Sequence, residues 1–369
     1  MNASLNEKLG TVKWGEYKLG TLFDIENTLS FNVDKLVDGT EYDYVTRTSI
    51  NQGILQTTGF VNKSNINISG TWSLGLLSMD FFYRRKPWYA GQFVRKIIPN
   101  VSIPERAVPF FSTILNKQKP ILLSVLVRSV DETFKNISIK LPETADGKID
   151  FDFMESFIAE LEAERVAELS AYLTVSGLDN YELSSEEKAI IERYKKNQIP
   201  FSEFEFIEIF NNIKQGRRLK KEDQLPGHIP FVMSGITNTG VVGYISNPVA
   251  QFPKNSITVD IFGNSFFRNY DFGAGDDTGV YWNTKREYSQ TCMLFFAAAM
   301  ESALRGKYSY GKKLRSSQST HFKMQLPTKD GKPDYDTMAA LISAVQKLVI
   351  KDVVLYADRK IEETKAITK

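Results

Sequence analysis

The stretch Leu141-Pro-Glu-Thr-Ala-Asp-Gly-Lys-Ile-Asp-Phe-Asp-Phe-Met154 recurs in altered form as Leu326-Pro-Thr-Lys-Asp-Gly-Lys-Pro-Asp-Tyr-Asp-Thr-Met338. Both copies contain a Leu-Pro pair, an Asp-Gly-Lys turn and an Asp-aromatic-Asp sequence, at an offset of 184 or 185 residues. Self-similarity at a fixed period is the mark of a duplicated structural unit. The period therefore predicts that the chain of 369 residues contains one unit twice.

Shorter matches upstream keep the same order and nearly the same offset. They pair Leu22-Phe23 with Ile209-Phe210, Asn51-Gln-Gly-Ile54 with Asn238-Thr-Gly-Val241, Phe82-Tyr-Arg84 with Phe266-Phe-Arg268, Trp88-Tyr-Ala-Gly91 with Phe272-Gly-Ala-Gly275, and Phe110-Phe111 with Phe295-Phe296. A common order favours duplication over chance. The chain is long enough for two or three domains, so two copies fit its length.

Composition and length exclude several protein classes. Hydrophobic residues make up 42% and charged residues 24% of the chain, which is typical of a globular protein and not of a disordered one. The longest strongly apolar run, Cys292–Met300, has nine residues, whereas a membrane-spanning helix needs about 20. No apolar signal-peptide core lies near the N-terminus. The single cysteine excludes an internal disulfide, so we expect an intracellular, cytoplasmic protein without a membrane partner.

Helices are predicted after each Asp-Gly turn. The first runs from about 152 to 173, with Asp152 as its cap and Glu155 at capping-box spacing. The second begins near Met338. An acidic segment, 178–196, is predicted to hold a further short helix that opens on a capping box and has no counterpart after the second copy.

Apolar residues recur at helical spacing along both long helices. The positions are Met154, Ile158, Leu161 and Leu169 in the first helix and Leu341, Val345, Leu348 and Tyr356 in the second. Such stripes pack either against the preceding domain or against each other. Each helix follows a complete unit, and its predicted sequence contains neither Gly nor Pro. We therefore expect the two helices to pair with each other.

Charge is distributed unevenly, although the net charge is only +2. Residues 1–149 carry 18 basic and 14 acidic side chains, and residues 201–333 carry 17 and 12. Residues 150–200 carry 5 and 12, and residues 334–369 carry 6 of each. Two basic blocks therefore alternate with an acidic and a neutral helical block, which suits two modules that each face a polyanion.

Several basic clusters lie in these two blocks. The residues that we predict to contact DNA are Arg47, Arg84, Arg85, Lys86, Arg217, Arg218, Lys312, Lys313, Arg315, Ser317 and Gln318. Basic side chains neutralise phosphates, and Ser and Gln can hydrogen-bond to phosphates or to base edges. The acid-free stretch between Asp43 and Asp80 is rich in Thr, Ser, Asn and Gln, which suits base edges and β-turns equally well.

Motifs for catalysis are mostly absent. The chain has no P-loop sequence. Asp276 and Asp277, together with Lys285, could form a metal-dependent nuclease site. However, Gln92 and Phe93 stand at the corresponding positions of the first copy, so such a site would be present only once. We predict no catalytic residue, metal site or cofactor in this chain, with the nuclease kept as an alternative.

The order of unit, helix, unit and helix resembles the DNA-specificity (S) subunit of type I restriction–modification systems, and its segments look most similar to the S-type subunit of type IIB systems. The resemblance covers essentially the whole chain. The passages that carry it are Tyr44-Val-Thr-Arg-Thr-Ser-Ile-Asn-Gln-Gly53, Trp88-Tyr-Ala-Gly91, Lys214-Gln-Gly-Arg-Arg-Leu-Lys-Lys221, Ile229-Pro-Phe231, Asn238-Thr-Gly-Val-Val-Gly-Tyr244 and the two Leu-Pro junctions. The acidic segment 178–196 departs from exact two-fold symmetry.

The resemblance implies a mixed α/β fold with a pseudo-two-fold repeat. Residues 1–149 and 201–333 would be target-recognition domains, each reading one half of a split sequence in double-stranded DNA. Residues 150–200 and 334–369 would be helical spacers that pair as an antiparallel coiled coil. Their other faces would dock methyltransferase or fused restriction–methyltransferase subunits. S-adenosylmethionine and magnesium would bind those partners, and this chain would catalyse nothing.

Two other function classes compete with a DNA reader. One is the nuclease at Asp276 and Asp277, which would cleave DNA without partners. The other is a protein-only adaptor that uses the helices alone. In that case, removing the charges of Lys312, Lys313 and Arg315 would leave every DNA-dependent activity unchanged.

Overall fold

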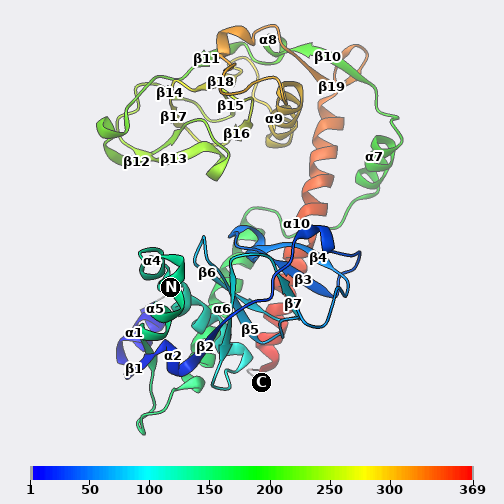
Figure 1. Cartoon of the computed structure of the whole chain (residues 1–369). Coiled ribbons are helices and arrows are strands. Elements are labelled where there is room, and N and C mark those ends of the chain that lie inside the picture. The colour runs from blue at the N-terminus through cyan, green and yellow to red at the C-terminus, as the bar shows by residue number, and fades with distance from the viewer. Residues whose placement is uncertain (1–2, 368–369) are drawn as a thin grey trace. The chain divides into compact units, whose positions relative to one another are not determined.

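Two compact units make up the computed structural model, which describes residues 3–367. The first unit runs to Leu169 and includes the end of the C-terminal helix from Lys360, and the second unit is Ser170–Arg359. Each sheet takes all its strands from one unit. The predicted duplication is therefore also a division of the fold, as Figure 1 shows. The finer division into recognition domains and helical spacers stays a prediction.

The first unit is built from mixed helices and strands. In chain order these are α1 (Ala3–Thr11), β1 (Trp14–Lys18), α2 (Leu19–Leu22), β2 (Phe23–Asn27), η1 (Val33–Lys35), β3 (Tyr42–Val45), η2 (Ile50–Gly53), β4 (Ile54–Thr58), β5 (Thr71–Gly75), β6 (Asp80–Arg84), β7 (Trp88–Ala90), β8 (Val94–Pro99), η3 (Glu105–Ala107), α3 (Val108–Lys117), α4 (Lys119–Leu123), η4 (Val127–Ser129), α5 (Val130–Asn136), β9 (Ser138–Pro142) and α6 (Phe151–Val175), whose last residues from Ser170 belong to the second unit.

The second unit repeats this order. Its elements are α7 (Ser185–Lys195), β10 (Phe201–Glu205), α8 (Phe206–Ile209), β11 (Asn212–Gln215), η5 (Lys221–Asp223), β12 (Pro226–Val232), η6 (Thr237–Gly240), β13 (Val241–Ile245), β14 (Gln251–Phe252), β15 (Ser256–Asp260), β16 (Ser265–Arg268), β17 (Phe272–Ala274), β18 (Thr278–Trp282), α9 (Gln290–Leu304), η7 (Ser316–Gln318), β19 (Lys323–Lys329), β20 (Lys332–Pro333) and α10 (Tyr335–Ile367), which ends in the first unit.

The sheets of the two units correspond strand by strand. The antiparallel sheet β2-β8-β5-β6 is matched by β11-β18-β15-β16, and β4-β3-β7 is matched by β13-β12-β17, which adds β14 at its edge. In each unit one strand pair is parallel: β3 with β7, and β12 with β17. A parallel pair brings the carboxyl ends of both strands to the same edge of the sheet, and the candidate site lies at that edge.

The position of α7 corrects one expectation from the sequence. We expected the segment 178–196 to be an insertion without a counterpart. Instead, α7 precedes β10 as α1 precedes β1, so it is the first helix of the second copy. The predicted capping box is confirmed, because Ser184 Oγ accepts from the backbone of Glu187 and the Glu187 carboxylate accepts from the backbone of Ser184. This helix therefore restores the two-fold repeat.

The long helix α6 begins one residue before the expected start near 152, α10 begins three residues before Met338, and a different residue caps α6. Asp150 Oδ1 accepts a 2.8 Å hydrogen bond from the backbone nitrogen of Phe153, so Asp150, and not Asp152, caps α6. Asp334 accepts the equivalent bond from Thr337 at 3.1 Å at the start of α10. Oxygen acceptors at this position satisfy backbone N–H groups that have no partner within the helix.

The first turns of both long helices pack against their own units, which corrects part of the coiled-coil prediction. Met154 and Ile158 are buried in the core of the first unit, and Leu161 packs against that core. Leu341 is buried with Ile190 of α7 in the second unit. These side chains pack inside their own unit, so they are not available for packing between the two long helices.

The remaining predicted pairing residues are half-buried or exposed. Leu169 is half-buried, whereas Val345, Leu348 and Tyr356 are exposed to between 45% and 50%. Pairing of α6 with α10 as an antiparallel coiled coil stays a prediction.

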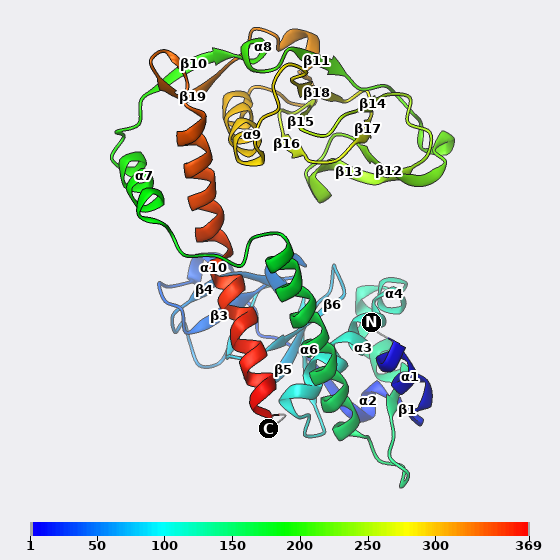
Figure 2. The same cartoon turned by 180° about the vertical axis from the view of Figure 1, so that it is seen from behind.

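Within residues 3–367, every helix is too short or too polar to span a lipid bilayer. Figure 2 shows the two long helices from behind.

Candidate nucleic-acid interface

An exposed turn of left-handed residues follows β3 in the first unit and β12 in the second. Asn51, Gln52 and Gly53 have φ values of 48°, 54° and 77°. In the second unit Asn238, Thr239 and Gly240 have φ values of 47°, 51° and 85°. Left-handed backbone costs a residue with a side chain roughly 1–2 kcal/mol, and it is unusual for a β-branched residue such as threonine. We call these two segments, 51–53 and 238–240, the pinned turns.

A buried arginine holds the first pinned turn. Arg84, at the end of β6, is only 2% exposed. Its Nη2 donates to the carbonyl oxygen of Gln52 at 2.6 Å, and its Nε donates to Ser73 Oγ at 2.9 Å. Burial lowers the pKa of Arg84 to about 10, and the nearby charge of Asp43 opposes that shift. A buried guanidinium needs such partners, so the turn and the arginine stabilise each other.

The second pinned turn is held in the same way. Arg268, at the end of β16, is 1% exposed, and its Nη2 donates to the carbonyl oxygen of Thr239. Its Nε donates to Thr258 Oγ1 at 3.1 Å, on the strand that corresponds to that of Ser73. Burial lowers the pKa of Arg268 as well. Since two copies of one unit keep both the strain and its support, the turn has a role that a relaxed loop would not fill.

Further hydrogen bonds close each pinned turn. The backbone nitrogen of Thr46 donates to Gly53 O at 2.8 Å, and Met233 donates to Gly240 O at 2.9 Å. The tips are exposed, and Ile50, beside the first turn, is 79% exposed. The side-chain amides of Asn51 and Asn238 also donate back to the carbonyl oxygens of Ile54 and Val241, at 3.1 and 3.3 Å, and Thr239 Oγ1 accepts from Arg268 Nη1 at 3.0 Å. The turns therefore present polar side chains on a fixed backbone.

A cleft lies beside the pinned turn in each unit, at the edge where the parallel strands end. The cleft of the first unit has a volume of about 720 Å³ and is lined by Asn32, Val33, Asp34, Tyr44, Thr46, Arg47, Thr48, Leu77, Gly91 and Gln92. The cleft of the second unit has a volume of about 650 Å³ and is lined by Arg218, Leu219, Lys220, Lys221, Glu222, Gln224, Met233, Val242, Gly275 and Asp276. Both include the residues after the second parallel strand and the short helix η1 or η5.

The clefts differ in charge. Arg47 is the one cation in the lining of the first cleft, and its guanidinium lies 5.3 Å from the centre of the Phe93 ring. The second cleft has Arg218, Lys220 and Lys221 in its lining together with Glu222 and Asp276, and Lys220 pairs with Glu222 at 3.8 Å. Equivalent positions in the two clefts therefore carry different side chains, which would contact different chemical groups on a ligand.

One predicted cluster closes around the second cleft. Arg315 Nη1 donates to the backbone oxygen of Asp276, and Gln318 Oε1 accepts from the backbone of Arg315 at 3.2 Å. Arg217, exposed, is fixed through its backbone nitrogen to Ala274 O at 2.9 Å. The structure thus brings Arg217, Arg218, Arg315 and Gln318 to one edge of the second unit.

The other residues predicted in this region lie on the same exposed loop, which connects α9 to β19. Lys312 lies over the ring of Tyr308 and Lys313 over that of Tyr310, with Nζ 5.8 and 4.7 Å from the ring centres. Ser317 is exposed within η7. The first unit has α4 and α5 in the corresponding place, so this basic loop is specific to the second unit.

Three predicted residues of the first unit are less suited to bind phosphate. Arg84 lies outside the candidate interface, because its guanidinium is buried and donates to the pinned turn. Arg85 pairs with Glu105 at 2.9 Å, and Lys86 pairs with Asp43 at 2.9 Å. Paired charges are partly neutralised, so we expect them to contribute little to polyanion binding.

In the sequence, the pinned turns stand out as a match within the repeat, and the first also as part of the polar stretch between Asp43 and Asp80, but their left-handed backbone is not predicted. The available signal was the repeat itself: both copies keep an Asn-x-Gly sequence and an aromatic-aromatic-Arg sequence.

Asp276 and Asp277, the residues of the alternative nuclease site, follow β17 in a tight turn, where the Asp276 carbonyl accepts from Gln215 and Arg315. Across residues 3–367, no three His, Cys, Asp or Glu side chains are grouped closely enough to hold a metal ion.

The sequence and the fold of the chain are similar to those of known DNA-specificity proteins. The profile of the type I restriction modification DNA specificity domain matches residues 11–171 and again residues 199–354. The chain is 24% identical over 353 residues to the Type II restriction enzyme BgcI specificity subunit S.BcgI of Heyndrickxia coagulans, covering 92% of this chain and 96% of that protein. It is also similar to the crystal structure of the S subunit of a type I restriction–modification system from M. genitalium, with a TM-score of 0.55, 15% identity and coverage of 97% and 94%.

These matches confirm the predicted resemblance. The structural likeness supports the fold, and the two profile matches cover most of the chain. Proteins of this kind are DNA-recognition subunits and not enzymes, so the nuclease and the protein-only adaptor find no support. The chain belongs to the family of type I restriction–modification DNA specificity domains, of which it carries two in tandem.

Proposed function

We propose that each unit reads one half of a bipartite target in double-stranded DNA, with the pinned turn and its neighbouring cleft as the contact surface. The observation that carries this proposal is the duplication of the pinned turn, with its left-handed residues and its buried arginine. A DNA reader needs polar groups held at fixed positions, because base-edge hydrogen bonds depend on geometry. Asn51, Gln52, Asn238 and Thr239 would supply such groups, because all four are exposed and hydrogen bonds within the unit hold the side chains of Asn51, Asn238 and Thr239 in place.

Basic residues around the clefts would set the register on the DNA backbone. Arg47 in the first unit and Arg217, Arg218 and Arg315 in the second are exposed beside the clefts. Lys and Arg neutralise phosphates and release counterions, which gives affinity without sequence information. Sequence information would come from the turns and from the uncharged cleft residues.

The chain would work in a complex. We expect methyltransferase or fused restriction–methyltransferase subunits to supply the chemistry, together with S-adenosylmethionine and magnesium bound to those subunits. A cytoplasmic location follows from this role, because the substrate is DNA inside the cell. The single cysteine, Cys292, is buried and free, which agrees with a reducing compartment.

The proposal is tested by equilibrium binding to duplex DNA, with the partner subunits present, between about 50 and 200 mM salt. We expect specific binding whose affinity falls steeply with salt, as phosphate neutralisation requires. The double variant Asn51→Ala, Gln52→Ala should lose discrimination at one half of the target by at least about tenfold, because each good base-edge pair contributes about 1–3 kcal/mol. Asn136→Ala, on an exposed turn of α5, is the matched control. Affinity that does not change with salt, or equal effects of both variants, contradicts the proposal.

A further inference from the structure

A basic loop of the second unit, residues 305–315, connects the end of α9 to η7. It contains no acid, and its five cations are all exposed: Arg305, Lys307, Lys312, Lys313 and Arg315. Within residues 3–367, none of these five makes an ion pair; the pairs in the block 201–333 are Lys220 with Glu222, Lys323 with Glu203 and His321 with Glu205. We call the segment 305–315 the basic arm.

The end of the basic arm is fixed beside the second cleft. Leu314 is buried, and its backbone nitrogen donates to Ile261 O at 2.9 Å. The guanidinium of Arg315 donates to the backbone oxygen of Asp276, which lines the second cleft. The basic arm therefore extends the surface around this cleft.

The tip of the basic arm is a tight turn that carries two lysines beside two tyrosines. Ser309 and Lys312 exchange backbone hydrogen bonds of 3.1 and 3.0 Å, which close the turn. Lys312 Nζ lies 5.8 Å from the centre of the Tyr308 ring, and Lys313 Nζ lies 4.7 Å from that of Tyr310. An aromatic ring attracts an ammonium group without neutralising its charge. Since Tyr310 is itself 82% exposed, the tip presents two cations and a phenol hydroxyl to solvent.

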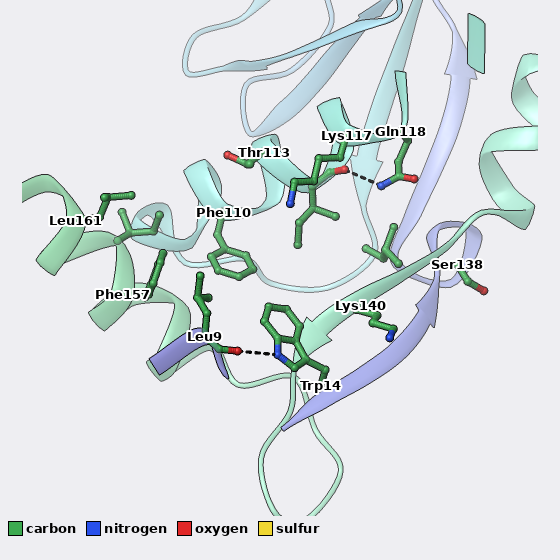
Figure 3. Close-up of a pocket in the computed structure, with 13 residues that line it drawn as sticks. Leu9, Trp14, Phe110, Thr113, Lys117, Gln118, Ser138, Lys140, Phe157 and Leu161 are labelled. Carbon is green, nitrogen blue, oxygen red and sulfur yellow. Dashed lines mark hydrogen bonds between the residues drawn. The ribbon is translucent and has the colours of Figure 1, made fainter. Parts of the chain in front are cut away.

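The first unit has helices where the second unit has the basic arm. Its α3, the counterpart of α9, ends at Lys117, and the side chain of Gln118 donates back to Ile114 O at 3.0 Å, as Figure 3 shows. The next helix, α4, begins at Lys119, whose ammonium group pairs with Asp80 at 2.6 Å. At this place the first unit therefore presents helical turns and a paired lysine.

The first unit has an acid-free stretch of five cations of its own, residues 81–104, but these are already engaged. Arg84 is buried and donates to the first pinned turn. The other four form ion pairs at 2.8 or 2.9 Å: Arg85 with Glu105, Lys86 with Asp43, Arg95 with Asp131 and Lys96 with Glu26. A phosphate would have to compete with these carboxylates. The two units thus differ in the cations that they offer, although their blocks contain 18 and 17 basic side chains.

We infer that the basic arm binds phosphates of duplex DNA, so that the two units contribute unequally to DNA affinity. For the identity of the polyanion we rely on the proposed function; the arm adds a contact surface beyond the two clefts. Phosphates near Lys312 and Lys313 would release their counterions, which strengthens binding to any sequence. The first unit would depend on the geometry of its pinned turn, because its basic stretch is paired or buried.

Equilibrium binding to a duplex without the motif that the complex methylates tests the basic arm, because phosphate contacts do not depend on sequence. With the partner subunits present, the double variant Lys312→Ala, Lys313→Ala should make the slope of log affinity against log salt shallower by about 2. Two double variants serve as controls, and each should change the slope by less than about 0.5. Arg85→Ala, Lys86→Ala removes two paired cations of the first unit. Lys329→Ala, Lys332→Ala removes two exposed cations from β19 and β20 of the second unit, far along the chain from the arm.

A photo-cross-linking amino acid in place of the exposed Tyr310 identifies what the basic arm contacts, and it should capture DNA in the same complex. The arm variant should keep the wild-type ratio of affinities for target and non-target duplexes, because phosphate contacts carry no sequence information. An unchanged slope for the arm variant, equal slope changes for all three variants, or capture of a partner subunit in place of DNA overturns the inference. A wild-type complex that binds target and non-target duplexes equally contradicts the proposed function, whereas the slopes and the cross-link alone decide the role of the arm.

Discussion

Arg84 donates a 2.6 Å hydrogen bond from Nη2 to the backbone oxygen of Gln52, and this bond joins the interior of the first unit to an exposed turn of left-handed residues. Arg268 makes the equivalent bond to Thr239 in the second unit. The charge of each arginine is buried, so each pair is stable only as long as the turn keeps its shape. This relationship explains how strained, polar and exposed residues are held in place, as the proposed function requires.

Replacing Arg84 should release the first pinned turn. The variant Arg84→Met leaves the Gln52 carbonyl and Ser73 hydroxyl without their donor, which should destabilise the first unit by about 1–3 kcal/mol. Hydrogen exchange of residues 50–53 should become faster, and DNA affinity should fall by at least about tenfold. Arg85→Met, at an exposed ion-paired position, should change stability by less than about 0.5 kcal/mol. Unchanged exchange in Arg84→Met speaks against the arginine as the support of the turn.

Adding a methyl group to the turn glycines should have unequal effects. A Cβ at Gly53 would meet Thr46 O at 3.2 Å, whereas a Cβ at Gly240 would meet Met233 O at 2.6 Å. Both glycines have positive φ, which alone costs an alanine roughly 1–2 kcal/mol. Because backbone oxygen cannot move aside easily, Gly240→Ala should lower the free energy of unfolding more than Gly53→Ala. Urea denaturation of both variants measures the difference, and equal losses contradict the geometry.

Exposed and paired arginines should differ in their salt dependence. Arg218→Ala removes a cation from the second cleft, so the slope of log affinity against log salt should become shallower by about 1. Arg85→Ala removes a cation that already pairs with Glu105, so the slope should hardly change. Fluorescence anisotropy on labelled duplex DNA at several salt concentrations measures both slopes. The same slope for both variants would mean that the clefts do not face phosphate.

The contact between α7 and α10 should weaken in acid. Burial by itself raises the pKa of Glu187, but hydrogen bonds from Ser343, Lys347 and the backbone of Ser184 outweigh it and lower the pKa to about 2. A carboxyl whose pKa is lower in the folded state stabilises the fold above its ordinary pKa of 4.5, and that stability is lost as pH falls from 4.5 toward 2.

The size of this effect is at most about 3 kcal/mol, because one pKa unit corresponds to about 1.4 kcal/mol. Urea denaturation between pH 7 and 3 should show a steeper loss of stability for the wild-type chain than for Glu187→Gln. Glu186→Gln, at the exposed neighbouring position, is the control and should follow the wild-type curve. Parallel curves for wild type and Glu187→Gln would contradict the account of this contact.

Local signals predicted much of this fold. The repeat, the two long helices and the capping box at Ser184 follow from short-range sequence patterns, and the structure confirms them. The two units with separate sheets follow from the duplication. The helices and the cap depend on residues a few positions apart, and the repeat on matching segments about half the chain apart, and the sequence displays both directly.

The candidate site depended on long-range contacts, which composition does not show. Arginine is usually exposed, so the sequence predicts Arg84 as a DNA contact, but the pairing of β5 with β6 places it inside, against Ser73. The equivalence of α1 and α7 became visible only through β1 and β10, because the two helices share no sequence motif. Met154 and Ile158 fit a coiled coil by spacing, yet the core of their own unit buries them.

The most direct test of two independent readers is the methylation pattern of cells that express the chain with its partner subunits. The wild-type chain should give one bipartite motif. The double variant Asn51→Ala, Gln52→Ala should alter or relax one half of that motif and leave the other half intact, and Asn238→Ala, Thr239→Ala should do the reverse. A motif in which both halves change together, or in which neither variant has an effect, would contradict the account.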